Sequence, residues 1–229
     1  MAPVTPTASG RYGRSVSAPF LAPRLSIELT DASDPELTDG SAWEAMALRG
    51  QATGGTAEDV EITRSHATSL RLTGMHLVRP RITDCRFDRC ELSGVIVEEA
   101  VLERVEFADC RLSGAMFPDV RLRHVRFVGC RMDAVAFRMA VASHARFESC
   151  VLLGADLYAS EFAGSVFADS DLTGADLSQA RLAGARLHGS DLTDIVGSAA
   201  LRDVEIDACQ VVPMALAVFD GLGIRITER

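Results

Sequence analysis

The chain has 229 residues, of which 48% are hydrophobic and 24% charged, and this composition is typical of a globular protein with enough apolar material for one core. Its formal net charge of −9 argues against a general nucleic-acid-binding protein, which needs a basic face. No run of 18 apolar residues is present and the N-terminus lacks an apolar signal core, so the sequence predicts a cytoplasmic protein with no membrane contact.

The N-terminal part of the chain shows two kinds of weak patterning. Residues 1–26 are rich in Pro, Ser, Ala and Thr with three scattered Arg, so we expect a disordered tail. Residues 27–59 carry the only tryptophan, Trp43, and no clear period. We expect this second segment to be an N-terminal cap on the region that follows.

Residues 60–194 repeat with a period of five. Every fifth residue from Ile62 to Leu192 is apolar, and the residue two positions earlier is Ala, Ser, Cys or Val except at Leu70, Met75 and Pro80. A period of five fits neither the 3.6 residues of a helix turn nor the two-residue alternation of a strand. We therefore expect a chain that turns a corner every five residues, with one large and one small side chain pointing inward on each side.

Four such sides make a coil of 20 residues, and residues 20 apart stack in columns about 4.8 Å apart, the spacing of adjacent strands. Two columns stand out in the sequence. One is aromatic (Phe87, Phe107, Phe127, Phe147 and Phe167) and one is small (Cys90, Cys110, Cys130 and Cys150, continued by Ser170 and Ser190).

Several units match one consensus closely: ADLYA at 155–159, SDLTG at 170–174, ADLSQ at 175–179 and SDLTD at 190–194. In these residues the chain resembles the pentapeptide-repeat family, whose units read A-[DN]-L-x-x. The resemblance covers residues 60–194. It implies an all-β fold, a right-handed quadrilateral β-helix.

Candidate chemistry is sparse. The cysteine column could be a metal ladder or a redox relay, but a column points its thiols the same way, whereas tetrahedral zinc needs converging ligands. We interpret the cysteines as reduced, small, structural residues, and His124 and His144 as surface histidines rather than a metal pair. No His, Asp and nucleophile occur in a recognisable catalytic order, so we predict no enzyme, no cofactor and no metal.

A solenoid without catalytic residues works by being bound. The best-known members of the family are quinolone-resistance proteins, which are similar to a B-DNA rod in size and charge and bind DNA gyrase in its place. The resemblance therefore implies DNA gyrase or another topoisomerase as a partner, without direct nucleic-acid binding. The alternative is a general protein-interaction scaffold with an unknown partner.

Charge is distributed unevenly along the repeat. Residues 60–146 hold 11 acidic against 14 basic side chains, while residues 147–194 hold 8 acidic against 2 basic. The acidic C-terminal coils could imitate DNA phosphates, or the Asp of ADL and SDL could be the solvated consensus residue of the family. The candidate partner-binding acidic residues are Asp156, Glu161, Asp169, Asp171, Asp176 and Asp191.

A second candidate surface is apolar. Ile96 and Met116 occupy outward positions in one column, and Val101 and Val141 lie on the next face. Exposed apolar patches of this kind mark a covered surface, and the cover would be the N-terminal segment or a partner protein.

Residues 195–229 leave the five-residue frame. Pro213 is tolerated only in the first turn of a helix, so the sequence predicts a short C-terminal helix over about residues 213–220, stopped by Gly221 and Gly223. Its apolar residues predict a cap on the last coil or a homodimer contact, and the quinolone-resistance members, which dimerise through their C-terminal ends, imply the latter. These candidate dimerisation residues are Met214, Leu216, Val218 and Phe219.

Overall fold

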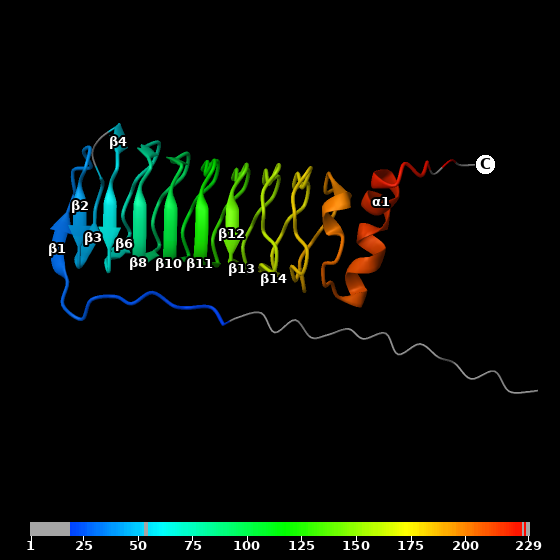
Figure 1. Cartoon of the computed structure of the whole chain (residues 1–229), viewed down its shortest axis with the longest axis horizontal. Helices are drawn as coiled ribbons and strands as arrows, with labels where there is room; N and C mark the ends of the chain where they lie inside the picture. Colours follow the sequence, from blue (N-terminus) through cyan, green and yellow to red (C-terminus); the bar gives the residue numbers. More distant parts are fainter. Residues whose placement is uncertain (1–18, 53–54, 226, 228–229) are drawn as a thin grey trace, which may run out of the picture.

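The computed structural model of the chain describes residues 19–52, 55–225 and 227. The chain winds into a straight solenoid that ends in one helix (Figure 1). One full coil separates Val101 from Arg121 and Phe107 from Phe127, and the members of each pair lie side by side. The β-helix predicted from the five-residue period is confirmed.

Most strands are three or four residues long because each side of the coil has five residues. In the described part of the chain the strands are β1 (Thr30–Ser33), β2 (Ala42–Glu44), β3 (Met46–Arg49), β4 (Thr56–Glu58), β5 (Glu61–Thr63), β6 (His66–Thr68), β7 (His76–Val78), β8 (Arg81–Asp88), β9 (Ile96–Glu98), β10 (Val101–Ala108), β11 (Arg121–Val128), β12 (Val141–Ser143), β13 (Arg146–Glu148) and β14 (Val166–Ala168). Of these, β8, β10 and β11 run for eight residues across one corner. Two short 3-10 helices, η1 (Ser198–Leu201) and η2 (Ala208–Gln210), precede the α-helix α1 (Val211–Gly221).

All strand pairs are parallel, and the pairs among β4 to β14 join residues 20 apart. One sheet runs in the order β1-β3-β6-β8-β10-β11-β13-β14, and a second, smaller sheet contains β4, β7 and β9. Beyond β14 the coils continue as single bridges, such as that between Asp171 and Asp191. Parallel stacking places identical positions of successive coils above one another, which is why the sequence repeats once per coil.

The core is a column of side chains inside the coils. The central residue of each unit and the residue two before it are buried from Val60 to Leu192. The aromatic column stacks almost face to face: the Phe127 ring centroid lies 4.9 Å from that of Phe107 and 5.0 Å from that of Phe147. The interior is narrow, so a large residue on one side of a unit requires a small neighbour.

The corners need a left-handed backbone. Every fifth residue from Arg64 to Asp194 has a positive φ, between 50° at Asp169 and 72° at Gly184. Most of these residues are not glycine, although left-handed residues are uncommon and carry a cost. Burial of two side chains per unit and continuous hydrogen bonding offset that cost.

The first coils differ from the rest. Strands β1 to β4 lie within the segment 27–59. Strands β2, β3 and β4 pair with strands of the repeat, while β1 pairs with β3, and the register shifts among them. Trp43 pairs with Ile62, one position short of a full coil, whereas Gln51 pairs with Arg71, a full coil away. This slip breaks the five-residue period, so the sequence shows no frame before residue 60.

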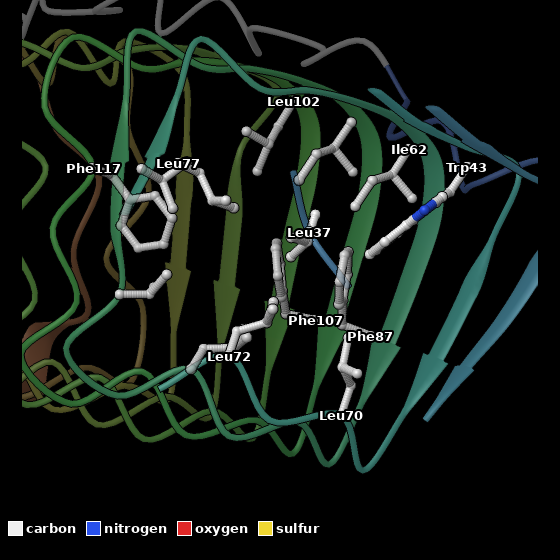
Figure 2. Close-up of a pocket in the computed structure, with 14 residues that line it drawn as sticks. Leu37, Trp43, Ile62, Leu70, Leu72, Leu77, Phe87, Leu102, Phe107 and Phe117 are labelled. Carbon is white, nitrogen blue, oxygen red and sulfur yellow. The ribbon is translucent and has the colours of Figure 1, made fainter. Parts of the chain in front are cut away.

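A small cavity of about 40 Å³ remains inside these first coils, lined by aliphatic and aromatic side chains (Figure 2). The cause is local. Ala67 stands where the next coil has Phe87, so the stacked ring column ends there. Leu70, one of the large residues at a normally small position, points into the same space as Leu37 and Trp43 and fills part of it (Figure 2).

Candidate interaction surfaces

Each coil presents four outward faces, which we define by the residues of one coil and their equivalents in the others. Face 1 contains residues 81–83, face 2 contains residues 86–88, face 3 contains residues 91–93, and face 4 contains residues 96–98. The corner residues between faces are 84, 89, 94 and 99 and their equivalents. The predicted candidate residues can be placed on this frame.

Four of the six predicted acidic residues lie on two adjacent faces. Asp171 and Asp191 bridge on face 3, and Asp156 and Asp176 bridge on face 4. The corner between these faces carries the exposed Asp194. We call these five residues the acidic ridge. Asp169 lies at the corner between faces 2 and 3, and Glu161 lies on face 1, so the structure does not bring all six together.

Three carboxylates of the ridge accept hydrogen bonds from backbone N–H groups two residues further along the chain. Oδ1 of Asp171 accepts the backbone N–H of Thr173 at 2.9 Å, and Oδ1 of Asp176 accepts that of Ser178 at 2.8 Å. Asp191 does the same with Thr193, and hydrogen bonds from the Thr193 hydroxyl and N–H lower the pKa of Asp191. These turns hold the acidic side chains in one orientation.

Ion pairs neutralise some of the acidic residues but not others. Asp156 pairs with Arg138, and Glu161 pairs with Arg181 at 2.8 Å. Within the described ranges, Asp171, Asp176, Asp191 and Asp194 have no basic side chain within ion-pair distance. The ridge therefore carries uncompensated negative charge.

Face 2 of the earlier coils is different, because its charges compensate one another. The Arg86 guanidinium binds Asp88 at 2.9 Å and Glu106 at 2.8 Å, and Glu106 also binds Arg126 at 3.5 Å. Arg126 binds Glu148 in turn. These alternating signs leave no strong field on this face.

The predicted apolar patch is divided between two faces. Ile96 and Met116 bridge on face 4, and Met116 is 40% exposed. Val101 and Val141 lie on face 1, two coils apart, with Val141 exposed and Arg121 between them. A shallow surface hollow contains Val101 and Val141 and extends over the corner that face 1 shares with face 4.

The C-terminal helix lies across the end of the last coil (Figure 1). Among the predicted dimerisation residues, Met214 is buried within the chain and Val218 is half-buried. Leu216 and Phe219 are exposed, as are Val212 and Leu222. The helix thus has one face on the solenoid and one apolar face in solvent.

The comparison with known proteins agrees with this geometry. The model described as "Pentapeptide repeat region" matches residues 60–137 and 100–152, and that described as "Pentapeptide repeats (8 copies)" matches residues 160–195, together more than half of the chain. The chain belongs to the pentapeptide-repeat family. No curated protein sequence gives a match.

Solved structures of pentapeptide-repeat proteins share the fold. The full-length structure of QnrB1, a plasmid-mediated fluoroquinolone resistance protein, is 16% identical, covers 85% of this chain and 100% of its own, and has a TM-score of 0.60. A trypsin-treated variant of QnrB1 is 18% identical, covers 85% of this chain and 99% of its own, and has a TM-score of 0.52. At this identity the likeness concerns the fold.

The cysteine column of this pentapeptide-repeat protein is buried, and its thiols take part in backbone hydrogen bonding. The Cys110 thiol donates to the carbonyl oxygens of Phe87 and Ala108, both at 3.3 Å. Ser170 donates its hydroxyl to the equivalent carbonyls, of Phe147 and Ala168. Cysteine and serine therefore share the column because both donate this hydrogen bond.

Burial also changes the acidity of the thiols. Outside the column, burial raises the pKa of Cys85 to about 12. The hydrogen bond with the Cys110 thiol, together with burial, raises the pKa of Cys130. Residues 19–52 and 55–225 contain no cluster of three or more His, Cys, Asp or Glu side chains that could hold a metal ion. No helix in this part of the chain is long and apolar enough to cross a lipid bilayer.

The prediction of two solvated histidines is wrong for His124. Its side chain is buried, with the His144 ring stacked on it at 4.5 Å and the Phe20 ring against it at 6.3 Å. The cause is the N-terminal segment. Residues 19–26, expected to belong to a disordered tail, lie along the corner between faces 1 and 2, while residues 1–18 lie outside the described part of the chain.

Proposed function

We propose that this protein is a non-catalytic protein-binding solenoid whose acidic ridge imitates DNA and binds DNA gyrase or another topoisomerase in the cytoplasm. The observation that carries the proposal is the ridge itself. Asp171 and Asp191 stack one coil apart with no compensating cation among the described residues, and backbone hydrogen bonds fix them on a rigid rod.

The charge density of the ridge is comparable with that of DNA. Its five carboxylates, of which only Asp156 is paired, span two coils, or about 10 Å along the rod. Double-stranded DNA of that length carries about six phosphate charges, at one per roughly 1.7 Å. Face 2 of the earlier coils cannot supply such a field because its charges neutralise one another. We therefore propose that only the C-terminal coils imitate the phosphate charges of DNA.

Dimerisation through α1 would strengthen this function. Leu216 and Phe219 present an apolar surface directly beyond the acidic coils. Two chains joined there would bring two ridges into one continuous surface. The likeness of the fold to QnrB1, named as a fluoroquinolone resistance protein, supports a protection role against topoisomerase inhibitors.

The exposed apolar residues Met116 and Val141 favour a second candidate, a general protein-interaction scaffold. The described N-terminal residues make their hydrogen bonds and ring contacts elsewhere, with the corner residues and Arg146. A partner protein would then be the cover of this patch, and its binding would depend weakly on salt.

The two candidates are separated by a charge-removal experiment on binding to purified gyrase. The double variant Asp171→Asn/Asp191→Asn keeps the oxygen that accepts the turn hydrogen bond and removes two charges. The matched control Glu99→Gln/Asp119→Asn removes two exposed charges from earlier corners. We expect the first variant to weaken binding by about tenfold or more and the control by much less.

The same binding should weaken as salt is added, and the protein should reduce quinolone-dependent inhibition of supercoiling. If the unmodified protein shows no salt-sensitive binding to gyrase at micromolar concentration, the imitation of DNA is excluded. The scaffold with the Met116 and Val141 patch then remains.

A further inference from the structure

The corner between faces 1 and 2 is covered, unlike the other corners. Between residues 69 and 149, every corner residue on the other three columns is exposed. On this column Asp84 and His124 are buried, and Arg104 and His144 are half-buried. The cover is the extended segment of residues 19–26, which runs along the solenoid beneath β8, β10 and β11 (Figure 1).

The segment is held through its backbone N–H groups. Ser26 N–H donates to the carbonyl oxygen of Arg64 at 3.3 Å. Arg24 N–H donates to Asp84 Oδ1 at 3.0 Å, and Leu21 N–H donates to His124 Nδ1 at 3.3 Å. Backbone donors carry no side-chain identity, so these bonds select an extended conformation rather than a sequence.

The spacing of the two acceptors matches an extended peptide. Asp84 and His124 lie two coils apart, about 9.6 Å along the rod, and three residues of an extended chain, from Leu21 to Arg24, span about 10 Å. Between the two acceptors lies Arg104, whose guanidinium binds both oxygens of Asp84, at 2.7 and 2.9 Å. Arg104 therefore orients Asp84 toward the peptide.

One aromatic side chain anchors the segment. The Phe20 ring meets the His124 ring edge-on, at an interplanar angle of 70°, and the Arg146 guanidinium lies 6.0 Å from its centroid. Phe20 is half-buried by these contacts. Pro23 fits the same arrangement, because its position makes no use of a backbone N–H.

We propose that this corner column, from Arg64 to His144, together with Arg146 beside it on face 2, is a binding site for an extended peptide with one aromatic residue, and that residues 19–26 of the same chain fill it in cis. A partner peptide of the same chemistry binds in their place. The required pattern is an aromatic residue with free N–H groups one and four positions after it. This site is separate from the acidic ridge and does not depend on any topoisomerase.

Residues 19–26 make few enough contacts for another peptide to replace them. Three backbone hydrogen bonds and one half-buried ring hold the segment, and Leu21 remains 43% exposed. A tethered occupant of this kind competes through its high effective concentration, which is about millimolar for short linkers. Weakening the tethered copy should therefore open the site to an added peptide.

The test uses a fluorescent peptide of residues 19–28, the full chain, and the full chain with Phe20→Ala. We expect the peptide to bind the variant roughly tenfold tighter than the unmodified chain, since only the variant has a weakened cis occupant. A peptide carrying the same substitution should bind neither chain. Equal binding to both chains, or no binding to the variant, overturns the proposal.

Two controls separate this result from other causes. Phe20 lies outside the solenoid, so Phe20→Ala should leave the melting temperature unchanged. A variant that fails to fold would show that the segment is a structural part of the solenoid, and it would overturn the proposal that a partner peptide replaces the segment. Hydrogen exchange at the Leu21 and Arg24 amides should be slow and independent of protein concentration. Exchange that slows as concentration rises would show a second copy's segment in the site and overturn the assignment in cis.

Discussion

Phe127 lies at the centre of the stacked ring column and is fully buried. It has phenylalanines on both sides along the rod and meets Phe137 edge-on at 6.1 Å. Phe127→Ala should lower the free energy of unfolding by about 3–5 kcal/mol, because the rigid coils cannot collapse onto the space left behind. Urea denaturation measures the loss. The exposed corner residue Met139 provides the control, and Met139→Ala should change stability by less than about 0.5 kcal/mol.

A loss below about 1 kcal/mol for Phe127→Ala would contradict the stacked column as the main source of core stability.

The six thiols give a second prediction at this scale, because the chain contains its own control. Cys209 is exposed in η2, while Cys85, Cys90, Cys110, Cys130 and Cys150 are buried. A thiol reagent should label one cysteine quickly in the native protein and the other five only slowly. Mass spectrometry of the labelled protein counts them, and denaturant should make all six react. Fast native labelling of Cys110 or Cys130 would mean that the column is open to solvent.

The docked N-terminal segment should respond to pH. Burial lowers the pKa of His124 below its usual 6.5, with contributions from His144, Arg123 and Arg104, while Glu103 opposes them. Nδ1 of His124 accepts the Leu21 N–H only while it carries no proton, so this contribution to docking is present above pH 6.5 and is lost as the pH falls from 6.5 through the folded-state pKa. The Arg146 guanidinium also faces this site, 6.0 Å from the centroid of the Phe20 ring.

The measurement is hydrogen exchange at the Leu21 amide, corrected for intrinsic rates. Protection should fall as the pH drops below about 6.5 in the unmodified chain. In His124→Gln it should show no such step. Equal pH profiles for both proteins would remove His124 as the titrating acceptor.

The elements of this protein differ in how far the sequence predicts them. The coils from residue 60 to 194 follow from the five-residue period, since the large apolar residue of each unit marks the position that points into the core. Strands β1 to β4 do not, because the one-residue slip at Trp43 and the small Ala67 hide the frame. Docking of residues 19–26 has no periodic signal at all, since its bonds use backbone donors and the acceptor His124 is 103 residues away.

The candidate surfaces could be predicted only in part, because the repeat shows which residues share a column but not how their side chains lie. The 20-residue spacing correctly pairs Asp171 with Asp191 and Ile96 with Met116. It cannot show that Arg138 neutralises Asp156, or that Met214 turns inward, because these contacts depend on side-chain conformations at the surface and at the cap.

At the scale of the whole molecule, we expect α1 to decide the oligomeric state. Leu216 is 66% exposed beside Phe219 and Leu222, and joining two such faces would bury apolar area in both chains. We expect a dimer at micromolar concentration, and Leu216→Glu should convert it to a monomer without lowering the melting temperature of the chain. Sedimentation velocity measures the change. Met139→Glu, a charge at an exposed apolar residue far from α1, should leave the dimer intact, and a monomeric unmodified chain would contradict the prediction.

The last coil of a parallel solenoid resembles the growing end of a fibril, since its unpaired carbonyl oxygens could bind another chain. Here Gln210 occupies that position. Its Nε2 donates to the carbonyl oxygens of Leu187 at 2.7 Å and Ser190 at 2.5 Å, and Asp207 accepts the N–H of Gly189. The Gln210 amide thus occupies the Ser190 carbonyl oxygen, which a further coil would bind, and α1 lies across the same end of the rod (Figure 1). We expect loss of Gln210 and α1 together to favour end-to-end association of folded rods rather than unfolding.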